Sequence, residues 1–227
     1  MKLENKKHII FDFDGTLIDS ALDLSAGVNH MLTTLGKDGF SNDEIHHWIG
    51  NGAATLVKRA LVGDKDISSF DDKKLFENAL TIFLDYYKEN CANKTYLYDG
   101  VKNSLHYLKD SGYTLSIVTN KPYAFIAPIL KKLDIDNLFS FYIGGDSLEM
   151  KKPDPYPLVY VCEKLNFSIE QSVMVGDSKN DILAARGANM SSIAVNYGYN
   201  YGEDIAIYKP DYIIDSFYQI EKILEKK

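Results

Sequence analysis

The sequence predicts an α/β fold in which helices cover a parallel sheet and a helical cap is inserted after the first strand. Three observations predict it. Residues 8–11 are apolar and β-prone and run into an acidic, glycine-containing turn. Residues from about 18 to 90 show helical periodicity only. After about residue 91, short apolar runs alternate with helical ones, which is the pattern of a parallel sheet covered on both faces.

The helical stretch after the first strand contains three apolar stripes with the three- and four-residue spacing of amphipathic helices. Breaks fall at residues 36–39 and around 63–64. The stripes are Leu24, Val28, Met31, Leu32 and Leu35; Leu56, Val57, Ala60 and Leu61; and Leu75, Phe76, Ala79, Leu80, Phe83, Leu84 and Tyr87.

The second half of the chain supplies the rest of the sheet. The expected strands are residues 115–118, 141–143, 173–175, 193–195 and 212–214. Together with residues 8–11 they predict a Rossmann-like parallel sheet. We therefore expect a catalytic core formed by residues 1–17 and 91–227 and a cap domain formed by residues 18–90. Ligands of open α/β sheets bind at the carboxyl ends of the strands, so the cap should lie over the site.

The composition is that of a globular protein, with 45% hydrophobic residues and a formal net charge of −7. Such acidity argues against nucleic-acid and membrane-surface binding, because both require basic patches. An anionic substrate must then be held by locally placed cations. Residues 1–7 lack the apolar core of a signal peptide, and no apolar run reaches the length of a membrane span. We expect a cytoplasmic location, with Cys91 and Cys162 as reduced thiols.

Two carboxylates follow the first strand, at Asp12 and Asp14. Alternate positions of a strand point the same way, so both side chains can face one site. The alternative is an Asx turn that only ends the strand. After residues 115–118, Thr119 and Asn120 can donate hydrogen bonds to a phosphate, although the same pair also suits a turn and helix cap.

Two further polar segments complete the set. Lys152, next to a proline, can present a fixed positive charge to a phosphate, or it can belong to a solvated charged loop. Asp177 ends the strand at residues 173–175, and Asp181 lies in the first turn of the next helix. Both carboxylates can face the same side. Capping of that helix is the alternative interpretation of Asp181.

Together these residues fit one chemical task. Mg²⁺ prefers a few carboxylates plus water and substrate phosphate, and Asp12, Asp14, Asp177 and Asp181 can supply the oxygens. Thr119 and Lys152 add the contacts that phosphoryl transfer requires. Carboxylates also act as nucleophiles in aspartyl-phosphate chemistry. The sequence therefore predicts a Mg²⁺-dependent phosphatase whose partner is a small phosphorylated metabolite.

The same segments, in the same order, resemble the motifs of the haloacid dehalogenase-like hydrolase superfamily. Residues 12–17 are similar to its first motif, Thr119 to the second, Lys152 to the third and residues 176–181 to the fourth. The resemblance covers essentially the whole chain, including the cap. It implies that Asp12 is the nucleophile and that the carboxylate two residues later is the general acid and base.

Three stretches resemble a narrower group in this superfamily, the bacterial phosphatases that act on 2-phosphoglycolate. They are residues 48–53, 152–155 and 196–203. Within the first, Gly50, Asn51 and Gly52 are the residues that we expect to face the substrate, because two glycines leave backbone N–H groups accessible to a carboxylate. The alternative is that these glycines only connect two cap helices.

Other functions remain open from the sequence. A dehalogenase of the superfamily needs no metal and lacks the second aspartate, so Asp14 argues against it. A phosphonate hydrolase would need a cap lysine, for which Lys58 is the candidate, although this residue also fits a solvated surface. A sugar-phosphate mutase uses the same core residues. A non-catalytic phosphate-binding regulator conflicts with the complete set of aspartates and lysine. The sequence leaves a monomer and a homodimer equally open.

Overall fold

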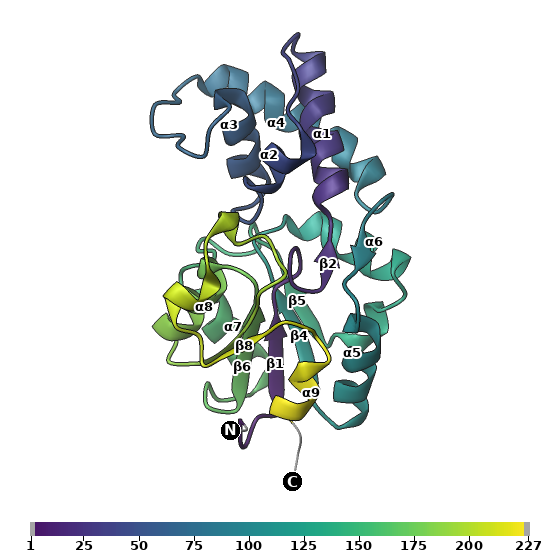
Figure 1. Ribbon diagram of the computed structural model, residues 1–227, viewed down its shortest axis with the longest axis vertical. Helices are drawn as coiled ribbons and strands as arrows, with labels where there is room; N and C mark the ends of the chain where they lie inside the picture. The colour runs from purple at the N-terminus through teal and green to yellow at the C-terminus, as the bar shows by residue number, and fades with distance from the viewer. Residues whose placement is uncertain (1–2, 225–227) are drawn as a thin grey trace.

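The computed structural model describes residues 3–224, so the ends of the predicted core, residues 1–2 and 225–227, lie outside the described residues. Its centre is a six-stranded sheet in the order β5-β4-β1-β6-β7-β8 (Figure 1). The strands are β1 (His8–Phe11), β4 (Thr114–Val118), β5 (Phe141–Ile143), β6 (Ser172–Gly176), β7 (Ser191–Val195) and β8 (Tyr212–Ile214). All neighbouring strands are parallel, which confirms the predicted fold class.

β1 lies at the centre of the sheet, and its residues are therefore buried on both faces. Ile9 pairs in register with Leu115 of β4 and Val173 of β6. Ile9 and Leu115 belong to the core on one face, whereas Ile10 and Met174 belong to the core on the other. A strand with two buried faces reads as a continuous apolar run, which is why residues 8–11 were recognisable in the sequence.

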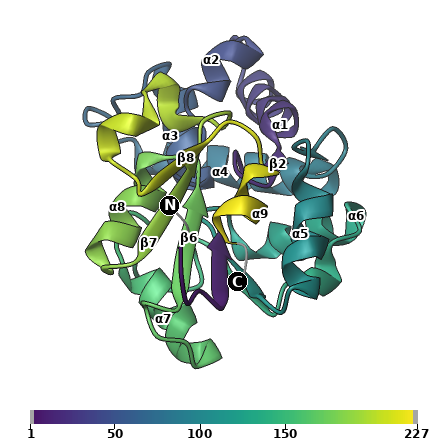
Figure 2. The same cartoon turned by 60° about the horizontal axis from the view of Figure 1, so that its bottom comes forward.

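Helices cover both faces of the sheet, as Figure 2 shows. One face carries α5 (Val101–Asp110), α6 (Ile126–Lys132) and α9 (Gln219–Ile223); the other carries α7 (Tyr156–Leu165) and α8 (Lys179–Gly187). Single 3₁₀ turns occur at η1 (Tyr123–Phe125), η2 (Asp136–Leu138), η3 (Asn200–Gly202) and η4 (Ile205–Tyr208). Within residues 3–224, no helix combines the length and the apolarity needed to cross a membrane.

Four helices form the cap: α1 (Ala21–Thr34), α2 (Asn42–His46), α3 (Ala53–Val62) and α4 (Lys73–Asn90). They lie together at one end of the molecule, away from both termini (Figure 1). The predicted apolar stripes are their buried faces, since Val28 of α1, Val57 of α3 and Phe83 of α4 are all completely buried.

The prediction that residues 18–90 are helical throughout is wrong at Ile18–Asp19. This segment is β2, which pairs antiparallel with β3 (Tyr96–Leu97). Two-residue strands are too short to show an alternating pattern. Next to them, the buried Asp23 carboxylate accepts hydrogen bonds from the backbone N–H groups of Lys94 and Thr95 at 2.9–3.0 Å. The two connections between cap and core are thus fastened to each other.

Candidate active site

The polar residues that follow the strands converge over the centre of the sheet. Asp12 follows β1, Thr119 follows β4 and Asp177 follows β6. Because β1 lies between β4 and β6, these three positions are neighbours at the carboxyl edge of the sheet. Lys152, from the loop between β5 and α7, joins them and is only 2% exposed.

Lys152 is the cation that holds the first aspartate in place. Its Nζ lies 3.0 Å from Oδ1 of Asp12 and 2.6 Å from Oδ1 of Asp181. Burial lowers the pKa of Lys152, but the two carboxylates more than offset this, so the net pKa is raised and the lysine stays charged. Oδ1 of Asp12 also accepts from the N–H of Phe13 at 2.7 Å. Among the described residues, none donates a hydrogen bond to Oδ2 of Asp12.

Asp12, Asp177 and Asp181 form a compact carboxylate cluster. Each offers one oxygen, these oxygens lie within 4.8 Å of one another, and all three residues are buried. Burial, followed by repulsion from Asp181 and Asp12, raises the pKa of Asp177 to about 8. Burial also raises the pKa of Asp12 to about 6, with Lys152 opposing the rise. Three carboxylates beside one lysine leave a local deficit of positive charge, which a divalent cation with oxygen ligands would remove.

Asp181 serves two of the roles considered for it from the sequence. Its Oδ2 accepts from the N–H and the hydroxyl of Ser178 at 3.0 and 2.8 Å, which makes a capping box at the start of α8. Its Oδ1 contacts Lys152. The helix cap therefore orients Asp181 toward the cluster instead of competing with that function.

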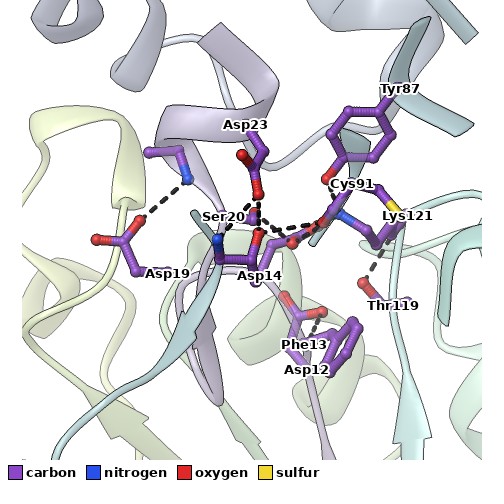
Figure 3. Close-up of polar contacts among 12 residues, drawn as sticks. Asp12, Phe13, Asp14, Asp19, Ser20, Asp23, Tyr87, Cys91, Thr119 and Lys121 are labelled. Carbon is purple, nitrogen blue, oxygen red and sulfur yellow. Dashed lines mark hydrogen bonds and ion pairs between the residues drawn. The ribbon is translucent and has the colours of Figure 1, made fainter. Parts of the chain in front are cut away.

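The structure places the Asp14 carboxylate apart from this cluster, among different partners. Its Oδ1 and Oδ2 lie 2.9 and 3.1 Å from Nζ of Lys121, and the hydroxyl of Ser20 donates to Oδ1 at 2.6 Å (Figure 3). A buried lysine neutralises this carboxylate on the cap side, so its oxygens are not grouped with those of Asp12, Asp177 and Asp181.

Lys121 is the main site residue that sequence reasoning missed. Its side chain is only 2% exposed, and besides Asp14 it donates to the hydroxyl of Tyr87 at 2.8 Å. Tyr87 belongs to α4 of the cap, so this contact crosses from core to cap (Figure 3). The available signal was the position of Lys121, two residues after Thr119, but a lysine before a proline is typical of an ordinary turn.

Thr119 and Asn120 lie at the site but differ in their contacts. The Thr119 hydroxyl accepts from the N–H of Lys121 at 3.2 Å and lines the same cavity as Asp12. The Asn120 amide donates to the carbonyl oxygens of Gly50 and Lys152 at 3.3 and 3.0 Å. Two carbonyl acceptors fix the orientation of this amide, so Asn120 connects the cap segment to the loop that carries the site lysine.

Gly50, Asn51 and Gly52 connect α2 to α3, and both glycines also line the cavity. The segment is therefore a helix connection and part of the cavity wall at the same time. Gly50 has φ +118°, and an added Cβ would lie 2.5 Å from the Tyr201 hydroxyl. Gly52 has φ +85°, and its Cβ would lie 2.7 Å from the carbonyl oxygen of Asn120. Alanine at either position would disturb the docking of the cap as well as any substrate contact.

Cap and core enclose a small cavity above Asp12. The space open to the centres of water molecules is about 30 Å³, enough for only a few of them. The core contributes polar groups to its wall, and the cap contributes mainly apolar ones. The lining residues include Asp12, Asp14, Thr119, Asn120 and Lys121 from the core and Leu24, Ile49, Leu56, Phe83 and Tyr87 from the cap. A ligand that fits here must be small.

The tyrosine-rich segment at residues 196–203 closes the other side of the site. The N–H of Tyr199 donates to Oδ2 of Asp177 at 2.7 Å, and its hydroxyl accepts from the N–H of Ser20 at 2.8 Å. The hydroxyl of Tyr201 accepts from the Asn180 amide at 2.8 Å. This segment therefore orients one carboxylate of the cluster and also contacts the start of the cap.

Known proteins are similar in sequence to this chain over nearly its whole length. The family profile described as haloacid dehalogenase-like hydrolase matches residues 9–195. A phosphoglycolate phosphatase of Colwellia psychrerythraea is 52% identical over 220 residues, which are 97% of each chain. A phosphoglycolate phosphatase of Psychrobacter arcticus is 48% identical over 94% of this chain and 93% of its own.

Solved structures share the fold described above. A crystal structure described as that of a predicted phosphoglycolate phosphatase from Haemophilus somnus superposes with a TM-score of 0.91. The two sequences are 41% identical, and the superposition covers 97% of this chain and 99% of the other. The position of the cap over the sheet is thus shared along with the sheet itself.

Proposed function

The chain belongs to the haloacid dehalogenase-like hydrolase family and is a phosphoric monoester hydrolase, and from this premise we propose that it hydrolyses 2-phosphoglycolate through a phosphoaspartate on Asp12. The observation that carries the proposal is the placement of Asp12. It is held by Lys152 at the small cavity between cap and core, which Asp14 and Thr119 also line. The identity to relatives named phosphoglycolate phosphatase supports the choice of substrate.

In the first half of the reaction, a carboxylate oxygen of Asp12 forms a bond to phosphorus while the bond to the glycolate oxygen breaks. Oδ1 of Asp12 is occupied by Lys152 and the N–H of Phe13, which leaves Oδ2 as the oxygen without a donor among the described residues. The positive charge of Lys152 and the hydroxyl of Thr119 stabilise the charge on the phosphoryl oxygens. Asn120 supports this arrangement indirectly, because its amide donates to the carbonyl oxygens of Gly50 and Lys152 and so holds the loop that carries the lysine.

Asp14 handles the protons in this proposal. Asp14 enters the first half-reaction in its protonated form and gives that proton to the departing glycolate oxygen, and the water that then attacks phosphorus returns a proton to it. That attack breaks the bond between phosphorus and Asp12 and releases inorganic phosphate. Lys121 and Ser20 fix the Asp14 carboxylate from two sides, which keeps it above the reacting atoms instead of turned toward the acidic cluster.

Mg²⁺ fits the carboxylate cluster, which offers only oxygen ligands and an excess of negative charge. Asp12, Asp177 and Asp181 are the residues that would hold the ion. When bound, it neutralises negative charge on the transferring phosphoryl group.

A thermal-shift experiment tests the metal site independently of turnover. Mg²⁺ should raise the Tm of the wild-type protein, because an ion bound only to the folded state contributes about 2.7 kcal/mol at a hundred times its Kd. For a chain of this size that is a shift of roughly 5–10 °C. Asp177→Asn should lose most of the shift, whereas Glu149→Gln, at an exposed position, should keep it. An equal shift in Asp177→Asn would show that Mg²⁺ binds elsewhere.

The cap supplies selectivity in this proposal, because Asp12, Lys152 and Thr119 recognise only the phosphate. Gly50 and Gly52, on either side of Asn51, lie on the wall of the cavity, where their backbone can meet the rest of the substrate. Their carbonyl oxygens are already used in part, because Asn120 and Asn180 donate to Gly50 and Lys151 donates to Asn51. A carboxylate only accepts hydrogen bonds, so it can bind this segment through the backbone N–H groups or the side-chain amide of Asn51.

The proposed substrate is tested by comparing kcat/KM across phosphate esters. The purified enzyme is assayed with 2-phosphoglycolate, three-carbon acid phosphates, hexose phosphates and nucleoside monophosphates, with Mg²⁺ and with a chelator. We expect the highest kcat/KM for 2-phosphoglycolate and loss of turnover with the chelator, because the cavity excludes large esters. Comparable or faster turnover of hexose phosphates would overturn the substrate, and turnover unaffected by the chelator would overturn the metal requirement.

A further inference from the structure

The cap places one polar side chain in the wall of the cavity. Among the described residues that the cap contributes to this wall, the side chains are aliphatic or aromatic except for the hydroxyl of Tyr87. Tyr87 lies in the second half of α4 and is 1% exposed. A tyrosine buried in an apolar wall normally gives its hydroxyl a partner, and here the partner comes from the core.

The hydrogen bonds around Tyr87 leave one donor unused. Nζ of Lys121 has three N–H groups, which are directed to Oδ1 and Oδ2 of Asp14 and to the Tyr87 hydroxyl. Lys121 therefore has no further N–H to offer. The Tyr87 hydroxyl accepts from Lys121, which leaves its own O–H as a donor. None of residues 3–224 accepts a hydrogen bond from it. This donor is adjacent to the cavity, with a positive charge 2.8 Å behind it.

The Tyr87 ring is held rigidly, so the direction of its hydroxyl is defined. Phe83, one turn earlier on α4, stacks on it with 5.5 Å between ring centroids and an interplanar angle of 11°. Phe125 of the core meets it edge to face at 4.9 Å. Burial raises the pKa of Tyr87, so the group remains a neutral O–H donor. A rigid donor costs little conformational entropy when a ligand binds.

We propose that the Tyr87 hydroxyl, polarised by Lys121, binds the carboxylate of the substrate and makes this enzyme selective for phosphorylated acids over neutral phosphate esters. The inference rests on the proposed function, since it assigns the second anionic group of 2-phosphoglycolate. The phosphate end of the substrate lies over Asp12 and Thr119. The other end then faces the cap, where the Tyr87 hydroxyl offers an O–H donor to the carboxylate, strengthened by the hydrogen bond that it accepts from Lys121.

This assignment also explains why a buried lysine is shared between core and cap. Lys121 contacts Asp14 of the core and Tyr87 of the cap at the same time. A carboxylate bound to Tyr87 would thus be held by the same pair that positions the proton-transferring group. Substrates that carry the acid would gain this contact with the cap, and esters that lack it would not.

The test compares two esters of similar size in two matched variants. The esters are 2-phosphoglycolate and ethyl phosphate, which lacks the carboxylate. Tyr87→Phe removes only the hydroxyl, and Tyr86→Phe makes the same change at the neighbouring, half-buried position on α4, where the ring stacks on His30. We expect Tyr87→Phe to lower the ratio of the two kcat/KM values by about tenfold to a hundredfold, mainly through KM, as loss of a hydrogen bond to a charged group does. Tyr86→Phe should leave the ratio unchanged.

The outcomes separate this inference from the proposed function. If the wild-type enzyme prefers 2-phosphoglycolate and Tyr87→Phe keeps that preference, the proposed substrate stands and the role of Tyr87 is overturned. The carboxylate would then be bound by the N–H groups at the start of α3. If the wild-type enzyme shows no preference for the acid, the proposed substrate is overturned and the inference with it. A general defect in folding or closure lowers turnover of both esters equally, and an unchanged ratio of this kind also counts against Tyr87.

Discussion

Asp12→Asn should give a folded protein whose kcat is lower by roughly 10⁴-fold or more, as when the nucleophile of other covalent enzymes is removed. The substitution keeps the shape of the side chain, and the amide can still accept from Lys152 and the N–H of Phe13. It removes the negative charge that attacks phosphorus and also weakens the carboxylate cluster. Steady-state hydrolysis of 2-phosphoglycolate with phosphate release measures the effect.

Two controls make this result specific to the nucleophile. The circular dichroism spectrum should match that of the wild-type protein, because the β1 strand ends before Asp12 and its packing is untouched. Acid quenching of the wild-type enzyme with phosphate-labelled substrate should trap label on the protein, and Asp12→Asn should trap none. Normal turnover of well-folded Asp12→Asn, or label retained by this variant, would refute the assignment.

The second large effect is expected for Asp14→Asn, which should lower kcat for an alkyl phosphate by about 10²–10⁴-fold. An amide cannot give a proton to the departing alkoxide or take one from water. An aryl phosphate has a leaving group that needs no protonation, so its first half-reaction should lose much less. Rapid-quench measurement of both esters separates the two half-reactions. Equal losses on alkyl and aryl phosphates in the first half-reaction would argue against proton transfer by Asp14.

The ion pair between Lys121 and Asp14 gives Asp14→Asn a second possible effect, and a substitution at Lys121 separates the two effects. Removing the Asp14 charge leaves the Lys121 ammonium buried without its ion-pair partner, which destabilises the site apart from any chemistry. The double variant Asp14→Asn/Lys121→Met removes both charges. If proton transfer is the lost function, the double variant regains stability but not turnover. Recovery of turnover would mean that the single variant failed through the stranded lysine.

The sheet and several residues of the candidate site could be predicted from the sequence because their signals are local. Each central strand is a short apolar run, and each candidate residue is placed by the strand that ends just before it. Asp12, Thr119 and Asp177 therefore needed no knowledge of distant contacts. The boundaries of the strands at residues 141–143 and 212–214 agree with β5 and β8 to the residue.

The missed features depend on residues that are far apart in the chain. Lys121 meets Tyr87 across 34 positions and Asp14 across 107, and no periodicity records such encounters. Tyr87 was assigned only to an apolar stripe, because its hydroxyl is one polar atom on a ring that does pack in the core. The Asp14 carboxylate lies apart from Asp12 because Lys121 binds it, and no sequence pattern records that contact. The two-residue spacing alone therefore predicted that Asp14 and Asp12 face the same metal site.

The pairing of β2 with β3 turns two separate crossings between cap and core into one hinge. Ile18–Asp19 leads into the cap and Tyr96–Leu97 leads out of it, and Asp23 binds the backbone just before β3. Two strands joined side by side cannot bend independently, so we expect any opening of the cap to bend both strands together. Substitutions at Tyr96 and Leu97, the strand of this pair that leads out of the cap, should therefore change how fast substrate enters and phosphate leaves.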